Sequence, residues 1–216
     1  MLVNKKMKQK KIFNKKIVLM DLVFLSVYIA WFFLSAVIPY VGYINLGHTQ
    51  ITFLSLLVPI ATFHLGIKGN LISGLGFGLS SFTLAFILGA TKYTYFDISV
   101  LPRIEMALVI YGFSWAFGIF KKPKMWKIGI LAFLASFFNI FFVLSAQYIR
   151  EAINPESLGK NGVPPIHLWI ITHPINLTVE PIVCIIIACS IFPLIKYLKN
   201  KYQGNKQVYY QYATSV

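Results

Sequence analysis

Residues 170–195 have the sequence IITHPINLTVEPIVCIIIACSIFPLI, which is long and apolar enough for a helix that crosses a bilayer. Asn176 and Glu180 interrupt this apolar run, and because they are four positions apart they share one face of a helix. A charged side chain inside such a helix costs roughly 2.5–3.5 kcal/mol on insertion scales, so it usually marks a functional site or a buried pair. The run therefore predicts a membrane helix with a polar site in it.

The composition of the whole chain is that of a membrane protein. Of its 216 residues, 57% are hydrophobic and 12% are charged, whereas a soluble domain is about 45–50% apolar and about 25% charged. A helix needs roughly 17–25 apolar residues to cross a bilayer. Runs near this length cover residues 17–40, 51–67, 70–90, 102–120, 127–148 and 170–195. We therefore expect an all-α integral membrane protein with six transmembrane helices.

The positive charge of the chain is concentrated at the ends of these runs. The net charge is +14; seven lysines lie in the first 16 residues, and further lysines cluster at 121–127 and 196–206. Lysine-rich ends and short loops mark the cytoplasmic side of a membrane protein. The pattern predicts that both termini are cytoplasmic, and it argues against nucleic acid as a partner. The expected segments are a basic N-terminal segment (1–16), a six-helix membrane domain (17–198) and a polar cytoplasmic tail (199–216).

A second polar position is predicted at a similar depth on a neighbouring helix. If residues 127–148 form a helix that ends at the outer surface, Asn139 lies about 13 Å below its end. By the same rise per residue, Glu180 lies about 15 Å below a helix start at Ile170. Pro181 removes a backbone donor and can kink the helix next to Glu180. The positions predict the floor of an outward-facing pocket; an interhelical hydrogen-bond cluster is the alternative.

The run 102–120 begins with two charged residues. Pro102 suits the first position of a helix, which places Arg103 and Glu105 at the outer rim. The chain has only two arginines against 18 lysines, and the planar fork of arginine binds carboxylates and phosphates. A ligand anion is one partner for Arg103, and the carboxylates of Asp97, Glu105 or Glu180 are the alternatives.

Motifs of hydrolytic enzymes and metal sites are absent from the sequence. There is no H-E-x-x-H, G-x-S-x-G or Walker motif, and the four histidines do not have the spacing of metal ligands. We therefore expect no catalytic activity, no metal and no cofactor.

Several short stretches occur in an order that resembles a known family. Asn176, Glu180 and Pro193 resemble the pattern of its last helix. The other stretches are residues 51–53 (ITF), 58–60 (VPI), 65–69 (LGIKG), 74–81 (GLGFGLSS) and 101–104 (LPRI). Over about residues 20–198, the chain is similar to the substrate-binding subunits, or S components, of energy-coupling factor (ECF) transporters.

The resemblance implies a bundle of six helices that binds a water-soluble vitamin in a pocket near the outer surface. The stretch 51–60 is most similar to the branch that takes pantothenate or the hydroxymethylpyrimidine precursor. An arginine at position 103 favours an anion, and therefore pantothenate. The implied substrate-binding residues are Gln50, Asp97, Arg103, Asn139, Gln147, Asn176 and Glu180.

The resemblance also implies partners and a location. S components are multi-pass proteins of the bacterial plasma membrane that do not use ATP themselves. They dock onto a membrane coupling subunit, which is bound to two cytoplasmic ATPase subunits. In the family, docking uses an A-x-x-x-A face of the first helix, and Ser26 and Ala30 are the nearest small pair here. Small side chains let helices approach closely, as such docking requires.

Two other functions compete with transport of a vitamin by an S component. A membrane enzyme acting on a lipid could use His173 and Glu180, which are seven positions apart and share a helix face. An autonomous secondary transporter is the other alternative. Such transporters are often built from internal repeats, and the sequence shows no repeat.

Overall fold

A computed structural model describes the chain in segments. The backbone is described for residues 2–38, 40–45, 50–158 and 162–214, and the side chains for residues 19–38, 40–44, 51–158 and 162–201. Six long helices form most of the fold: α1 (Leu2–Val37), α2 (Leu54–Leu65), α3 (Ile67–Leu88), α5 (Leu101–Ala116), α6 (Met125–Ile153) and α8 (Pro174–Thr214). The shorter elements are β1 (Tyr43–Asn45), β2 (Gln50–Thr52), η1 (Thr91–Tyr93), α4 (Phe96–Ser99), η2 (Pro155–Leu158) and α7 (Ile166–Thr172).

Each of the six apolar runs overlaps one of the long helices, but these helices differ in length. Four helical segments are long and apolar enough to cross a membrane: Leu19–Val37, Ile67–Leu88, Met125–Ile153 and Pro174–Lys201. The helix α2 has 12 residues and α5 has 16. A helix as short and as buried as α2 is typical of a protein core. The structure is therefore that of a mainly helical protein with four candidate membrane spans, and six crossings stay a prediction.

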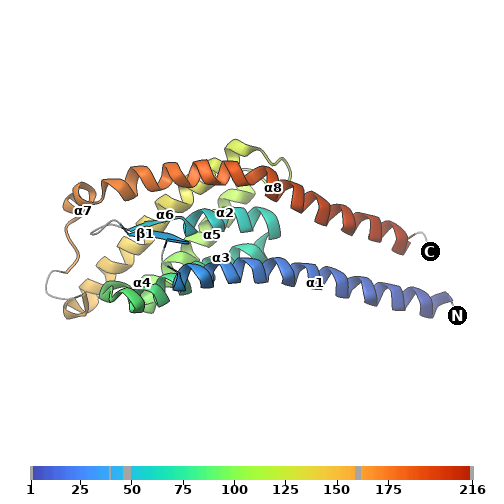
Figure 1. Ribbon diagram of the computed structural model, residues 1–216, viewed down its shortest axis with the longest axis horizontal. Coiled ribbons are helices and arrows are strands. Elements are labelled where there is room, and N and C mark those ends of the chain that lie inside the picture. The colour runs from blue at the N-terminus through green and yellow to red at the C-terminus, as the bar shows by residue number, and fades with distance from the viewer. Residues whose placement is uncertain (1, 39, 46–49, 159–161, 215–216) are drawn as a thin grey trace.

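The bundle is built around α2. This helix packs against α3, α5, α6 and α8, and α1 lies along α3. Ten of the twelve residues of α2 are buried. Figure 1 shows α1 and α8 on opposite sides of the bundle, with both chain termini at the same end and with α4 and α7 at the other end. Termini at the same end agree with an even number of crossings.

Glycines bring α3 unusually close to α5. A Cβ atom on Gly78 would lie 2.9 Å from Cα of Val100, and one on Gly74 would lie 2.7 Å from Cβ of Ala107. Real Cβ atoms essentially never come this close to another heavy atom, so a side chain at either position would force the helices to shift. The close contact places the middle of α3 beside the first turn of α5, where Arg103 lies.

A β-hairpin replaces the expected start of the second helix. Residues Ile51 and Thr52 were expected in a helix, but they pair with Ile44 and Tyr43 in an antiparallel ladder. The backbone N–H of Phe53 then donates to the carbonyl of Gly42 at 2.9 Å. Because β-branched residues are favoured in strands, Ile51 and Thr52 suit this pairing. The helix α2 therefore begins at Leu54 and not at residue 51.

The last apolar run forms two helices and not one. This changes the distance of Glu180 from the start of its helix. Its helix was expected to begin near Ile170, but α7 ends at Thr172 and α8 begins at Pro174. Proline lacks an N–H and disfavours a helical conformation in the residue before it, so a new helix begins there. Glu180 is therefore only about 9 Å from the start of α8.

At the two ends of the chain, the structure extends the helices beyond the expected segments. The basic residues 1–16 lie largely within α1, which begins at Leu2. The expected polar tail, 199–216, continues α8 to Thr214. The helix α6 likewise runs to Ile153, five residues beyond its expected end.

Candidate ligand-binding site

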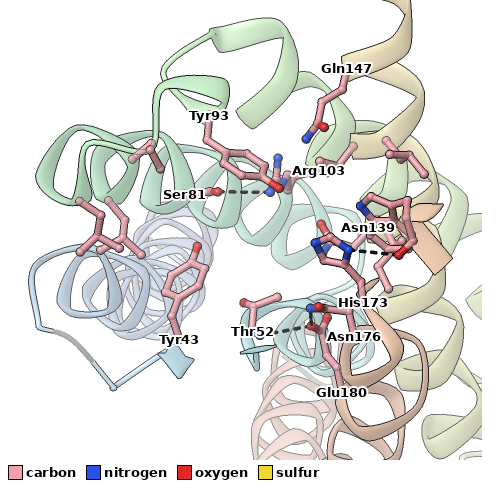
Figure 2. A pocket seen from close by; sticks show the side chains of 18 residues that line it. Tyr43, Thr52, Ser81, Tyr93, Arg103, Asn139, Gln147, His173, Asn176 and Glu180 are labelled. Carbon is pink, nitrogen blue, oxygen red and sulfur yellow. Dashed lines mark hydrogen bonds between the residues drawn. The ribbon is translucent and has the colours of Figure 1, made fainter. Parts of the chain in front are cut away.

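A cavity of about 320 Å³ lies at the end of the bundle near α7 and the hairpin. Its apolar wall includes Leu84 and Leu88 of α3, Val143 and Leu144 of α6, and Trp169 of α7. Polar and aromatic side chains also line it: Tyr43, Thr52, Ser81, Tyr93, Arg103, Asn139, Gln147, His173, Asn176 and Glu180, all labelled in Figure 2. The volume is at the lower end of the range for small-molecule sites.

Glu180 forms the floor of the cavity and joins three elements. Its side chain is 1% exposed. One carboxylate oxygen, Oε1, accepts a hydrogen bond from Oγ of Ser136 at 3.1 Å. The other, Oε2, accepts from Nδ2 of Asn176 at 3.1 Å and from the backbone N–H of Thr52 at 3.3 Å. Hydrogen bonds of this kind stabilise a buried carboxylate, because they replace part of the water it has lost.

Arg103 is buried at another side of the cavity, with a relative exposure of 5%. Its Nη1 donates to the carbonyl of Ile98 at 2.6 Å, and its Nη2 donates to Oγ of Ser81 at 3.2 Å. The ring of Phe77 lies 5.4 Å from the guanidinium carbon. The short helix α4 ends just before α5 and supplies the Ile98 carbonyl, which the sequence pattern did not predict. Glu105, in contrast, is exposed.

Among the described side chains, no carboxylate forms an ion pair with Arg103. Among the side chains that the structure describes, ion pairs within 4.0 Å join only Lys68 to Asp21 and Arg150 to Asp97. The Nε of Arg103 is buried without a hydrogen-bond partner in the described part of the chain. The carboxylates expected as partners therefore form no ion pair with Arg103, and the hydrogen bonds of its guanidinium go to neutral groups.

Two amides of α6, Asn139 and Gln147, line the cavity about two turns apart. Both are buried. The Oδ1 of Asn139 has no hydrogen-bond partner among the described residues. No hydrogen bond joins Asn139 to Glu180 in that part of the chain, but Ser136 of α6 does donate to Glu180, so interhelical hydrogen bonds are present beside the cavity. A buried acceptor without a partner is costly, and it is available to a ligand.

His173 lies at the junction of α7 and α8 and stacks on Trp169. The two rings are 4.6 Å apart and nearly parallel, with an interplanar angle of 5°. Nδ1 of His173 lies 3.1 Å from the carbonyl of Trp169 and 2.9 Å from Oγ1 of Thr172. Among the described contacts, none joins His173 to Glu180 by a hydrogen bond. Both side chains line the cavity, and no direct hydrogen bond couples them there.

Five of the seven expected binding residues line this cavity: Arg103, Asn139, Gln147, Asn176 and Glu180. Asp97 is not among the lining residues. Both of its carboxylate oxygens accept from Nη1 of Arg150, at 2.7 and 2.8 Å, and the Arg150 guanidinium lies over the ring of Tyr95. Asp97 therefore forms an ion pair with Arg150 and does not contribute to the cavity lining. Gln50 lies in β2, but its side chain is outside the described residues.

Sequence reasoning missed several lining residues. Tyr43 and Thr52 were missed because the hairpin that presents them was not predicted, and Ser81 because it lies in a glycine-rich stretch that suggests packing. Burial raises the pKa of the Tyr43 hydroxyl, which therefore stays neutral. Trp169 lies directly before the last apolar run, a position at which tryptophan commonly marks a membrane interface, so its sequence context did not indicate a binding site.

The expected docking pair lies on an exposed face of α1. Ser26 and Ala30 are both exposed and are one helical turn apart. Oγ of Ser26 donates to the carbonyl of Leu22 at 2.8 Å, within its own helix. The pair is therefore accessible to lipid or to a partner helix, and its role in docking stays a prediction.

Comparison with known proteins gave no assignment: no protein-family model and no curated protein matches this chain. The described residues also contain no group of three or more His, Cys, Asp or Glu side chains that could hold a metal ion. The function is therefore inferred from the cavity and its lining.

Proposed function

We propose that this protein is the substrate-binding membrane subunit of an ECF-type importer. It captures a water-soluble vitamin or vitamin precursor from outside the cell, with pantothenate as the favoured candidate, and delivers it inward with an ATPase-driven coupling module. The observation on which the proposal depends is a cavity of about 320 Å³ with a buried arginine and a buried glutamate in its lining. Such charges are costly in a membrane bundle and are normally kept for function.

The position of the cavity supports capture from outside. Both chain termini lie at one end of the bundle, whereas α7 and the hairpin beside the cavity lie toward the other (Figure 1). The lysine-rich terminal segments favour the cytoplasm. On this orientation, in a bacterial plasma membrane, the cavity lies on the outer side.

The proposal requires partners for energy and for delivery. The sequence has no Walker motif, so in this scheme ATP is used by two cytoplasmic ATPase subunits through a membrane coupling subunit. The exposed small side chains of Ser26 and Ala30 on α1 are the proposed contact with that coupling subunit.

The decisive experiment is identification of the natural ligand. The full chain is purified in detergent from cells grown in rich medium, and small molecules released on denaturation are identified by mass spectrometry. We expect one vitamin or precursor at about one molecule per chain. A lipid product in its place, or uptake by liposomes that contain this chain without any ATPase, would contradict the proposal.

A further inference from the structure

One face of α5 carries a carboxylate that no other group in the described part of the chain neutralises. We propose that this face is a docking site for a transmembrane helix of another protein, which places a lysine or arginine against Glu105. The proposal concerns a surface away from the cavity, and it does not depend on the transport function.

The exposed residues of α5 have the spacing of a helix-packing seam. They are Leu101, Glu105, Leu108, Gly112 and Trp115, and together they form the α5 seam; the opposite face of the helix is buried in the bundle. The spacing alternates between four and three residues, which is the repeat of knobs-into-holes packing between helices. A Cβ on Gly112 would meet no atom within 4 Å, so the seam has an open notch there. Small residues of this kind let a second membrane helix approach closely.

Glu105 lies far from either end of a candidate membrane span. It is two residues before Ala107, whose Cβ would lie only 2.7 Å from a Cβ on Gly74 of α3. At a rise of about 1.5 Å per residue, Gly74 is about 21 Å from the end of α3 at Leu88 and about 10 Å from its start at Ile67. The hydrocarbon core of a bilayer is about 30 Å thick. A membrane-spanning α3 therefore holds Glu105 within that core.

The charge of Glu105 distinguishes the α5 seam from an ordinary lipid-facing surface. Lipid covers exposed leucine and tryptophan side chains readily, but a carboxylate in the hydrocarbon core is costly unless it is paired. Among the described side chains, Glu105 has no hydrogen bond and no ion pair. Its neighbours on the seam, Leu101 and Leu108, carry no donor in their side chains. The missing cation therefore has to come from another molecule.

The same charge identifies the kind of partner. In a two-fold dimer of this chain, with its axis normal to the membrane, the two Glu105 carboxylates would lie at the same depth and repel each other. Cationic lipid headgroups lie outside the hydrocarbon core. A lysine or arginine on a partner helix supplies the charge at the right depth, and close packing at Gly112 holds that helix in place.

The test is photo-crosslinking in the membranes of cells that naturally contain the protein. The photoreactive amino acid benzoylphenylalanine is placed at position 108 of the full chain, and linked products are identified by mass spectrometry. We expect one other membrane protein, linked through a transmembrane segment with a Lys or Arg within about one helical turn of the linked residue. The matched control places the same amino acid at position 186, an exposed isoleucine of α8, and should not capture this partner.

Substitution of Glu105 then tests the ion pair. We expect the yield of linked partner to fall at least about tenfold in Glu105→Lys, because an attraction between opposite charges becomes a repulsion. Glu105→Gln, which loses the charge and keeps the shape, should also lower the yield. Exchange of the partner's Lys or Arg for Glu should restore linkage to the Glu105→Lys chain. Unchanged melting temperatures in detergent would show that both variants fold.

Three results would overturn the proposal. They are linkage of position 108 to lipid alone, linkage to a second copy of this chain, and a partner yield that neither substitution of Glu105 changes. Because none of the α5 seam residues lines the cavity, each of these results leaves the proposed transport function standing. Failure of the purified chain to bind any vitamin would overturn the transport function and leave the docking site standing.

Discussion

The backbone N–H of Thr52 donates a hydrogen bond to the carboxylate of Glu180 at 3.3 Å, across 128 positions of sequence. The contact joins the last residue of the hairpin to α8, and Ser136 joins the same carboxylate to α6. One buried side chain therefore holds the hairpin to the floor of the cavity. Any change in Glu180 should affect both ligand binding and the hairpin.

The substitution Glu180→Gln tests this double role. Glutamine has one acceptor oxygen and an amide that donates, so it cannot accept from all three donors. We expect ligand affinity to fall at least about tenfold and stability to fall by about 1–3 kcal/mol. Hydrogen–deuterium exchange of the Thr52 amide should become faster. Glu105→Gln, the same change at an exposed position of α5, is the control and should alter none of these quantities. Unchanged exchange at Thr52 in Glu180→Gln would refute the anchoring role.

The substitution Asn139→Ala should separate binding from stability. Since Oδ1 of Asn139 has no partner in the described structure, its removal relieves a buried unsatisfied acceptor. We expect the melting temperature of the ligand-free protein to stay the same or rise, while ligand affinity falls about tenfold. Thermal unfolding and calorimetry measure the two effects. Ser145→Ala, also on α6 but outside the cavity lining, serves as the control. A large loss of stability without loss of affinity would show that Asn139 is structural.

A pair of glycine substitutions tests the close contact between α3 and α5. A methyl group at Gly78 would clash with the backbone of Val100, whereas a Cβ on Gly112 of α5 meets no atom within 4 Å. Alanine favours a helix over glycine by about 1 kcal/mol. We therefore expect Gly112→Ala to raise stability slightly, and Gly78→Ala to lower it by about 1–3 kcal/mol through overpacking. Thermal unfolding in detergent compares them. Because the N–H of Arg103 bonds to the carbonyl of Val100, Gly78→Ala should also weaken ligand binding. Equal effects of the two substitutions would contradict the packing described here.

The ion pair of Asp97 with Arg150 should be structural. Asp97 does not line the cavity, and both of its oxygens contact Arg150. Part-exposed pairs contribute about 0–1 kcal/mol. We expect Asp97→Asn to lower stability by no more than that and to leave ligand affinity within about twofold, as calorimetry would show. A tenfold loss of affinity would place Asp97 in the binding site after all.

Much of the architecture was predictable because membrane helices leave a local signal. The long apolar runs located the six long helices, and polar residues inside apolar runs pointed to Asn139, Asn176 and Glu180, all of which line the cavity. Arg103 was singled out in the same way, by its charge and rarity. Each of these inferences needs only the cost of placing a polar group in an apolar helix.

The surroundings of those residues depend on packing between distant segments. The hairpin, the break at His173 and the hydrogen bond from Arg103 to the carbonyl of Ile98 were not predicted. The contact of Asp97 with Arg150 joins residues 53 positions apart, and that of Thr52 with Glu180 joins residues 128 apart. Hydrophobic periodicity indicates which residues of a segment are buried. It does not indicate which other segments they contact. The identity of the polar groups thus followed from the chain's local chemistry. Their partners, and the space left between them, followed from the way the helices pack.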